Sequence, residues 1–322
     1  MVNTHNGRPK VALLYGGFSK EREVSKKTAQ EVSKALTTLK YPATKVAVDN
    51  NLASKLKNLK PDIAFIALHG GTGEDGTLQA LLDVLEIPYT GSGVLASALA
   101  MHKTMAKRLF IANGIATPLF ITVRKGVHED LADRINSSLG FPVVVKPPSQ
   151  GSTIGLSIVY KEKDLESALT LGFNLEKELL IEKFTEGVEI TVGVLGNTKP
   201  KALPTLEIET KTGFYDYETK YTAGLSSHII PARIDSTQRQ QAKKAAVAAY
   251  KVLGCRGFAR ADFICPKGKE PLILEMNTIP GLTKLSLFPD AAQAAGIGFN
   301  ELVGTLIELA LEKKTAGTTL QR

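Results

Sequence analysis

The segments KVALLY (10–15), TKVAVD (44–49) and DIAFIAL (62–68) decide the fold of the first third of the chain. Each is a short apolar run with the length and composition of a buried strand. Residues 24–39 lie between the first two runs and carry apolar side chains at helical spacing, and TLQALLDVLE (77–86) has the same pattern. Strands that alternate with helices predict a parallel sheet with helices on its faces, which is the α/β class.

Two glycine turns follow strands of this predicted sheet, Gly16-Gly17 and HGGTG (69–73). Ligands of such sheets bind beyond the carboxyl ends of the strands, so both turns lie at the expected binding edge. The first turn lacks the complete G-x-G-x-x-G pattern and no acidic residue is placed to bind a ribose, so it does not indicate a dinucleotide site.

The remainder of the chain mixes helices with further strands. A helical pattern from Leu95 to Asn113 ends at Gly114, and Pro118 follows, which favours a domain boundary in this region. We expect three units: an α/β substrate domain (1–100), a central α+β lobe (101–187) and a C-terminal α+β lobe (188–322). The segments expected beyond the boundary are strands at 141–146, 156–160, 178–184, 257–264 and 271–277, and helices at 163–171, 236–253 and 300–313.

Composition excludes several classes of protein. Hydrophobic residues make up 43% of the 322, enough to fill cores, and no low-complexity tract is present. The longest uncharged stretch, 87–101, is interrupted by proline and glycine and is shorter than the ~20 apolar residues of a membrane helix. The first residues have no signal-peptide pattern. Cys255 and Cys265 form no C-x-x-C pair. We therefore expect a cytoplasmic protein without a membrane partner or a disulfide framework.

The net charge of +8 suits an anionic partner, such as a nucleotide phosphate. Lysine and arginine occur singly or in pairs, not in dense blocks with interleaved aromatic residues. Nucleic acid is therefore not an expected partner.

Two late strands carry the strongest chemical signal. The period of two in LILEMN places Glu275 and Asn277 on one face, and in FARADF it places Arg260 and Asp262 on one face. Carboxylate and amide oxygens without histidine or cysteine are the ligand set of Mg²⁺. The alternative is a pair of solvated strand ends bridged by a salt link.

A second signal is Lys146, which closes the VVVK strand ahead of the turn SQGSTIG (149–155). Small residues allow backbone N–H groups to approach phosphate oxygens, and the lysine adds a point charge. No Gly-Lys-Ser/Thr follows, so this is not a Walker A motif, and an ordinary hairpin loop is the alternative.

Two further segments have weaker signals. In SKEREVS (19–25), Ser19 can cap a helix and Glu21 and Glu23 can complement its dipole, without any site. The polar stretch 210–227 contains three tyrosines, and a loop of this length is usually functional or disordered.

Together these motifs resemble the D-alanine:D-alanine ligases of the ATP-grasp superfamily, in order and spacing, over nearly the whole chain. The resemblance implies ATP enclosed between the central and C-terminal lobes, with the N-terminal domain contributing to the amino-acid site. It rests on GGFSKEREVS (16–25), HGGTGEDGTLQ (69–79), KPPSQGSTIGLS (146–157), FYDYETKY (214–221), GFARADF (257–263) and LEMNTIPGLT (274–283).

The resemblance assigns most of the ATP and metal contacts to the two lobes. It implies phosphate contacts from Lys103, Lys146 and Lys220, the last at the γ-phosphate. The turn Gly151-Ser152-Thr153 would cover the phosphates. Adenine would contact Glu182, Lys183 and Phe184, and the ribose would contact Glu189. Asp262, Glu275 and Asn277 would bind two Mg²⁺ or Mn²⁺ ions.

The resemblance also assigns the amino-acid contacts. Glu21 would hold the ammonium of the first D-alanine within a hydrogen-bonded set with Ser152 and Tyr221, and His69 would lie nearby. Arg260 and the backbone N–H of Gly281 would stabilise the oxyanion. Ser286 and Leu287 would bind the carboxylate of the second D-alanine. The implied product is D-alanyl-D-alanine for peptidoglycan precursors, formed through an acyl phosphate by a homodimer.

Tyr221 favours the dipeptide, because family members that make the D-lactate ester carry a different loop without this tyrosine. Two positions depart from the family: His102 and Gln150 stand where acidic residues are frequent.

Two alternative functions stay open. One is a related ligase that uses D-serine or D-lactate as second substrate, which an acceptor assay separates. The other is a non-catalytic binding protein, which would release no ADP. A dehydrogenase is a weaker alternative that nicotinamide binding would test.

Overall fold

The computed structural model describes residues 7–127, 130–210 and 226–312. Its N-terminal unit has a parallel sheet, as predicted, and the strand order is β2-β1-β3. All residues of β3 and the first four of β1 are buried, as is usual for parallel strands covered on both faces. The elements are β1 (Val11–Gly16), α1 (Arg22–Thr38), β2 (Ala43–Val48), α2 (Leu52–Leu59), β3 (Ile63–Ile66), the 3₁₀ turn η1 (Gly71–Gly73) and α3 (Thr77–Val84).

The helix predicted from Leu95 to Asn113 is two helices, α4 (Val94–Met101) and α5 (Lys103–Ala112). They are separated at His102, whose backbone is extended (φ −89°, ψ 90°). The amide of Lys103 then donates to the carbonyl of Pro148 at 2.9 Å, a contact made with the central unit. The break therefore places Lys103 at the start of α5, facing the following domain. Gly114 ends α5 with a positive φ of 68°, as predicted.

The central unit has an antiparallel sheet of order β4-β7-β5-β6 with its own hydrophobic core. Apolar residues of β5 and β7 face helices α6 and α7 in this core, which includes Val143, Val145, Leu169 and Ile181. The strand β4 and the helix α6 were not predicted. The elements are β4 (Phe120–Arg124), α6 (Leu131–Ser138), β5 (Val143–Lys146), β6 (Ser157–Val159), the 3₁₀ turn η2 (Glu162–Asp164), α7 (Leu165–Phe173) and β7 (Glu178–Lys183).

The C-terminal unit has a sheet of order β11-β10-β8-β12-β13, with β9 paired to β8, and all these pairs are antiparallel. Helix α9 packs on this sheet, and Asp235 caps it by accepting from the amide of Gln238 at 2.8 Å. The elements are β8 (Val188–Leu195), β9 (Lys201–Ala202), β10 (Leu206–Thr210), β11 (Ser226–Ile229), α9 (Ser236–Val252), β12 (Phe258–Cys265), β13 (Leu272–Asn277), α10 (Leu287–Ala294) and α11 (Phe299–Leu311).

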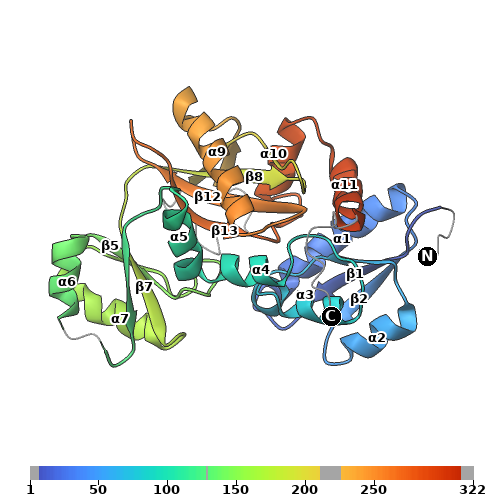
Figure 1. The fold of residues 1–322 in the computed structure, drawn as a ribbon, viewed down its shortest axis with the longest axis horizontal. Coiled ribbons are helices and arrows are strands. Elements are labelled where there is room, and N and C mark those ends of the chain that lie inside the picture. The colour runs from blue at the N-terminus through green and yellow to red at the C-terminus, as the bar shows by residue number, and fades with distance from the viewer. Residues whose placement is uncertain (1–6, 128–129, 211–225, 313–322) are drawn as a thin grey trace.

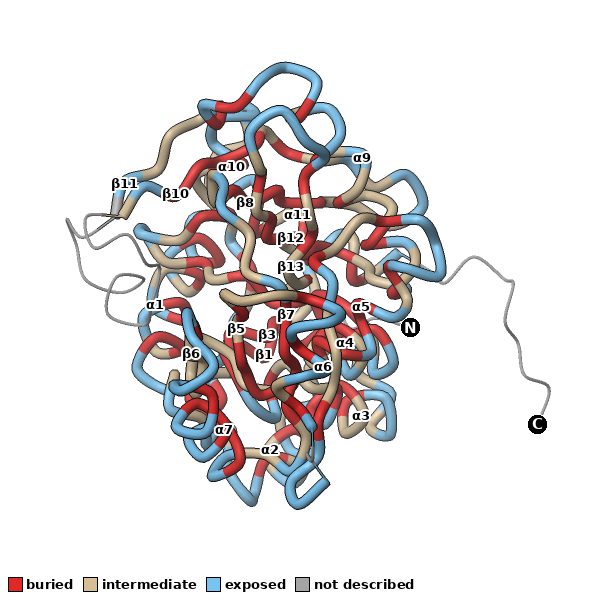
Figure 2. Tube along the Cα trace, turned by 90° about the vertical axis from the view of Figure 1, so that its left-hand side faces the viewer, coloured by how far each residue is buried: buried red, intermediate tan, exposed pale blue. Residues whose placement is uncertain are grey.

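The first and third units share one hydrophobic core. Leu302 and Ile307 of α11 belong to the same buried cluster as the strands β1 and β3, and α11 lies against α1 (Figure 1). Arg256 adds a polar link, because its guanidinium donates to the carbonyls of Gly91 (3.0 Å) and Tyr89 (3.1 Å). Figure 2 shows buried segments running through the sheets and exposed turns at the periphery. The N-terminal and C-terminal units thus form one body, and the central unit, which has its own core, lies beside it.

In the described ranges, no single helix is long and apolar enough to cross a membrane. The pair α10 and α11 reaches the required length and composition only together, with a bend of 102° between the two helices.

Candidate active site

Two adjoining cavities lie where the three units meet. The larger, about 660 Å³, lies between the central and C-terminal sheets. The smaller, about 100 Å³, lies between the N-terminal domain and the loop before α10. Lys103, Ser152 and Glu275 line both cavities. The site therefore has one space of ligand-pocket size joined to a second that accommodates only small molecules.

The four residues predicted on late strands lie on one face of the sheet. Antiparallel pairing of β12 and β13 sets Arg260 opposite Asn277 and Asp262 opposite Glu275. Side chains of directly opposed residues project from the same face. The predicted convergence of these four residues on one face of the sheet is therefore confirmed.

Both carboxylates of this group face cations. Arg260 donates to Asp262 through Nε (2.8 Å) and Nη2 (2.7 Å), and Glu275 lies 3.2 Å from Lys103 Nζ. Thr191 Oγ1 also donates to Asp262, at 2.7 Å. The salt link that was the alternative to a metal site is therefore present on this face.

The donor set also matches a hard cation in type. Asp262, Glu275 and Asn277 supply carboxylate and amide oxygens, the ligands that Mg²⁺ prefers. In the part of the chain that the structure describes, no cluster of three or more His, Cys, Asp or Glu side chains is placed to hold a metal ion. A metal in this site would therefore need the amide oxygen of Asn277, water or a phosphate to complete its shell.

Most of the residues assigned to the nucleotide line the larger cavity. Lys103 Nζ donates to the carbonyl of Gln150 at 2.7 Å, which joins α5 to the turn after β5. Lys146 Nζ lies 2.6 Å from Glu182 Oε2. Lys183 and Phe184 follow Glu182 along the wall of the cavity, which is completed by Thr153 and Glu189.

Lys107 is a buried lysine that the sequence reasoning missed. Its side chain is 0% exposed, and its ammonium lies 2.6 Å from Glu182 Oε1. Burial lowers the pKa of Lys107 to about 8, although Glu182 opposes the shift. Burial would raise the pKa of Glu182, but Lys107 and Lys146 outweigh it and hold that pKa below its usual range. The sequence feature that could have identified Lys107 is its spacing four residues after Lys103, which places both lysines on the same side of one helix.

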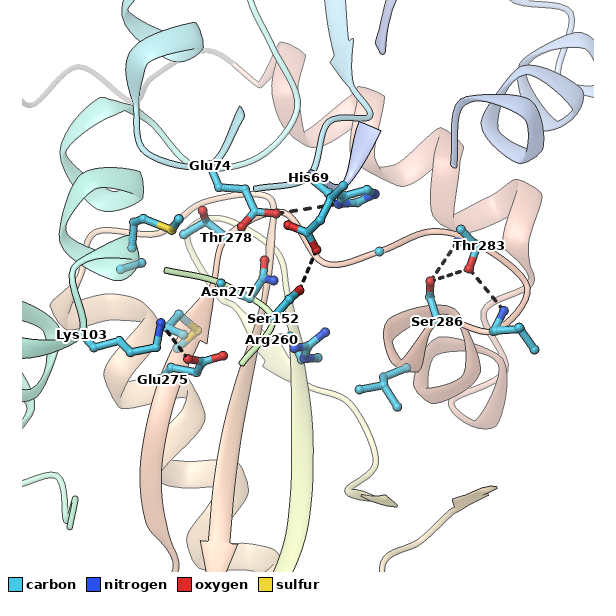
Figure 3. A pocket seen from close by; sticks show the side chains of 18 residues that line it. His69, Glu74, Lys103, Ser152, Arg260, Glu275, Asn277, Thr278, Thr283 and Ser286 are labelled. Carbon is cyan, nitrogen blue, oxygen red and sulfur yellow. Dashed lines mark hydrogen bonds and ion pairs between the residues drawn. The ribbon is translucent and has the colours of Figure 1, made fainter. Parts of the chain in front are cut away.

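The turn after β5 reaches the N-terminal domain. Ser152 and Thr153 adopt left-handed conformations, with φ of 51° and 62°, which are unusual for residues other than glycine. Ser152 Oγ donates to Glu21 Oε1 at 2.7 Å (Figure 3). Gly151 also lies beside Glu21, at the smaller cavity. The turn therefore bridges both cavities instead of forming an isolated hairpin loop, and strained residues of this kind are frequent at functional sites.

Glu21 immediately precedes α1, and no side-chain hydrogen bond caps this helix. The Ser19 hydroxyl instead accepts from the Glu21 amide (3.1 Å) and donates to the carbonyl of His69. A Cβ at Gly70 would lie 2.3 Å from Glu21 Oε2, so this glycine makes room for the carboxylate. The helix-cap interpretation of Ser19 is therefore wrong, and the segment orders the smaller cavity.

His69 is 5% exposed at the edge of that cavity. Its Nε2 lies 2.8 Å from Thr28 Oγ1. Its Nδ1 lies 3.8 Å from Glu74 Oε1, as Figure 3 shows. Glu74 lines the same cavity and was not predicted as a site residue. Its place in GGTGED, directly after the glycine turn, was the available signal.

The opposite end of the smaller cavity is formed by the loop before α10. Ser286 Oγ accepts from the amide of Thr283 at 3.0 Å, and a Cβ at Gly281 would lie 2.7 Å from Ser286 Oγ. Leu287 begins α10. The first turn of a helix directs backbone N–H groups outward and carries a partial positive charge, which suits an anionic group.

Four other predicted positions have different outcomes. Lys220 and Tyr221 lie outside the described residues. Gln150 donates from Nε2 to Glu176 Oε1 at 3.2 Å, so its side chain is directed at the central lobe. His102 forms the break between α4 and α5, next to Lys103.

Comparisons with known proteins agree with this architecture. A family model described as the D-ala D-ala ligase C-terminus matches residues 109–308, and one for the D-ala D-ala ligase N-terminus matches residues 47–92. A D-alanine–D-alanine ligase of Pelotomaculum thermopropionicum is 53% identical over 308 residues, covering 94% of this chain and 97% of the relative.

Solved structures extend the match to the whole fold. A D-alanine–D-alanine ligase from Bacillus anthracis complexed with ATP superposes with a TM-score of 0.82 at 34% identity, covering 94% of this chain and 97% of that one. The VanG D-Ala:D-Ser ligase from Enterococcus faecalis gives a TM-score of 0.82 at 32% identity, covering 94% and 100%.

Two lobes that enclose a cavity lined by lysines and carboxylates, joined to an α/β domain, define an ATP-grasp ligase. Within this class, the chain belongs to the D-alanine–D-alanine ligase family.

Proposed function

We propose that this protein joins two molecules of D-alanine to D-alanyl-D-alanine at the expense of ATP, releasing ADP and phosphate, for peptidoglycan precursor synthesis. Family membership supports the reaction. The observation that carries the proposal is the meeting of the two cavities at Lys103, Ser152 and Glu275. A phosphate donor in the larger space and a carboxylate acceptor in the smaller one would then react at that junction.

ATP would occupy the larger cavity, between the central and C-terminal lobes. Lys103 and Lys146 would bind its α- and β-phosphates, and Gly151, Ser152 and Thr153 would cover them. The base would contact Glu182, Lys183 and Phe184, and the ribose would contact Glu189. Lys220 is assigned to the γ-phosphate. These assignments are supported by the lining of the larger cavity, except for Lys220, which the structure does not describe, and Gly151, which lines the smaller cavity.

Asp262, Glu275 and Asn277 would hold two Mg²⁺ or Mn²⁺ ions. Such ions neutralise charge on the phosphates during transfer. The pairing of Asp262 with Arg260 and of Glu275 with Lys103 supports a role for this face in balancing charge, because each carboxylate is already held beside a cation.

The first step activates a carboxylate. A carboxylate oxygen of the first D-alanine attacks the γ-phosphorus, the bond from that phosphorus to ADP breaks, and an acyl phosphate forms. Glu21 would hold the ammonium of this D-alanine, with Ser152 and Tyr221 in the same hydrogen-bonded set. The 2.7 Å bond between Ser152 and Glu21 supports this arrangement.

The second step forms the peptide bond. The amine of the second D-alanine, after losing a proton, attacks the acyl carbon, and phosphate leaves when the tetrahedral intermediate collapses. Arg260 and the Gly281 N–H would stabilise the oxyanion, an interaction that strengthens as charge develops. Ser286 and Leu287 would bind the carboxylate of the second D-alanine at the start of α10, and His69 would flank the first substrate. These residues all line the smaller cavity.

The alternative within the family is D-serine or D-lactate as second substrate. The VanG D-Ala:D-Ser ligase has the same fold, so the fold does not decide between acceptors. Tyr221 favours D-alanine over D-lactate.

We further propose that the enzyme acts in the cytoplasm, where ATP is available. It would act as a homodimer, and each chain would have three domains divided near residues 100 and 187. The family resemblance supports the dimer, and light scattering tests it.

The reaction is tested with D-alanine labelled with ¹⁸O in its carboxylate. An acyl phosphate predicts that each turnover transfers one ¹⁸O to inorganic phosphate, and that ADP release requires D-alanine and does not occur with L-alanine. Unlabelled phosphate would contradict the acyl phosphate. ATP binding without ADP release from folded protein would favour a non-catalytic binding protein.

A further inference from the structure

Lys107 lies behind the wall of the larger cavity, where two lysines share one carboxylate. Its side chain is fully buried, whereas Lys146 reaches the cavity lining. Glu182 lies between them, with Oε1 2.6 Å from Lys107 and Oε2 2.6 Å from Lys146. Both oxygens of one carboxylate are thus engaged by separate ammonium groups.

The charges of this cluster do not cancel. Two ammonium groups and one carboxylate leave a net charge of +1, because Lys107 remains protonated at neutral pH and Glu182 remains ionised. Without Lys107, Glu182 and Lys146 would form a neutral pair. An interior charge is screened less than a surface charge, so this difference in net charge would change the electrostatic potential in the adjoining cavity.

Lys107 also has fixed neighbours on several elements. Its ammonium donates to Thr117 Oγ1, which in turn donates to the carbonyl of Ile273 at 2.7 Å. Ile273 belongs to β13, the strand that carries Glu275 and Asn277. Lys107 itself lies one helical turn after Lys103. One buried ammonium therefore joins the elements that carry both cavity lysines and the metal-type ligands.

We infer that Lys107 is a positioning residue for the nucleotide. It pairs with one oxygen of the Glu182 carboxylate and partly neutralises it, so that Lys146 presents an uncompensated positive charge to the phosphates. Lys107 does not contact the substrate in this role. The inference rests on the proposed binding of ATP in the larger cavity and goes beyond it by assigning a residue outside the cavity.

The experiment measures ATP binding in the presence of Mg²⁺ by calorimetry, together with the KM of D-alanine. The variant K107M keeps an unbranched side chain and removes the charge. We expect ATP to bind at least tenfold more weakly, while the KM of D-alanine changes less than twofold. R108M is the matched control, because it removes one positive charge from the exposed neighbour on the same helix and should leave ATP affinity within twofold.

The double variant K107M/E182Q separates charge from packing. It is compared with E182Q alone, because Glu182 is itself assigned to the adenine and its replacement changes ATP binding on its own. Without the carboxylate, Lys146 keeps its charge whether or not Lys107 is present, so ATP affinity should differ less than threefold between E182Q and the double variant. A tenfold loss from K107M in the E182Q protein as well would overturn the inference, as would K107M with unchanged ATP affinity in the wild-type protein. K107M with a lowered Tm and unaltered ATP affinity would show a structural role only.

Two outcomes keep the inference distinct from the proposed function. If the wild-type protein itself does not bind ATP, the proposed function fails. If K107M does not fold, K107Q provides the test, because it removes the same charge but keeps a polar side chain: ATP should bind at least tenfold more weakly, and an affinity within twofold of the wild type would overturn the inference.

Discussion

Asp262 and Glu275 lie directly opposite each other on β12 and β13, yet each carboxylate is held by a cation from a different direction. Arg260 binds Asp262 from two residues earlier on the same strand, and Lys103 reaches Glu275 from the start of α5. Two carboxylates side by side would repel each other without these cations. The pair is therefore arranged for a role that involves positive charge, whether from side chains or from metal ions.

Replacing Glu275 by glutamine tests this role. The change keeps the shape of the side chain but removes its charge, and we expect kcat to fall at least about 100-fold, because metal-assisted charge stabilisation contributes several kcal/mol to the transition state. ADP release is measured across a range of Mg²⁺ concentrations. The exposed Glu270, substituted in the same way, serves as control. Near-normal turnover of E275Q at saturating Mg²⁺ would remove Glu275 from the metal site.

The contact between Ser152 and Glu21 joins the phosphate turn to the amino-acid site. Because a hydrogen bond to a charged group contributes about 1.5–3 kcal/mol, S152A should lower kcat/KM for D-alanine roughly 10- to 100-fold. Steady-state kinetics at saturating ATP measure the effect. The exposed Ser137→Ala provides the comparison and should be neutral. Equal kinetics for both variants would show that this contact plays no part in the reaction.

Gly257 lies where the first and third units meet. Its φ is +71°, and an added Cβ would lie 3.2 Å from the amide nitrogen of Gly91. Gly254 has nearly the same φ, +72°, with nothing within 4 Å of an added Cβ. Both alanine variants carry the left-handed penalty of about 1–2 kcal/mol. We expect G257A to lose more thermal stability than G254A, and the difference in Tm isolates the contact between the units. Equal Tm values would mean that the backbone at Gly91 moves to make room for the added methyl group without a loss of thermal stability.

Glu207 predicts how stability depends on acidity. Hydrogen bonds from the Arg233 side chain hold the pKa of Glu207 below its usual value, although burial opposes them. Since the folded pKa is lowered, the stabilisation is complete above the unfolded carboxyl value of about 4.3 and is lost as the pH falls through the folded pKa. The Tm of E207Q should therefore be lower than wild type at pH 7, with the gap narrowing toward pH 3. A gap that is constant with pH would contradict this origin. The exposed Glu270→Gln, which lies in the loop between β12 and β13, is measured alongside as the comparison.

The sequence was sufficient to predict the parallel N-terminal sheet and the pairing faces of β12 and β13, because both depend on local periodicity. It did not predict which residues would stand opposite each other. The register shifts between Asp262 and Phe263, so that Phe263 pairs with Ile273 while Asp262 pairs with Glu275. The irregularity comes directly after the pair Asp262 and Glu275 and leaves Leu274 out of the register, and no local pattern indicates a bulge at that point.

Buried charges escaped prediction for a related reason. Lys107 lies on a helix between positions that face a core, and its role depends on Glu182, a residue 75 positions later that reaches it only after β7 joins the central sheet. At the break at His102, the amide of Lys103 bonds to the carbonyl of Pro148, which is likewise a tertiary interaction. Local propensity carries no information about such contacts.

The central claim is tested most directly by identifying the product formed from ATP, Mg²⁺ and equal concentrations of D-alanine, D-serine and D-lactate, by mass spectrometry. We predict D-alanyl-D-alanine as the main product, formed in step with ADP. A product containing mainly D-serine or D-lactate would contradict the assignment of the second substrate, and the absence of any condensed product from folded protein would contradict ligation itself.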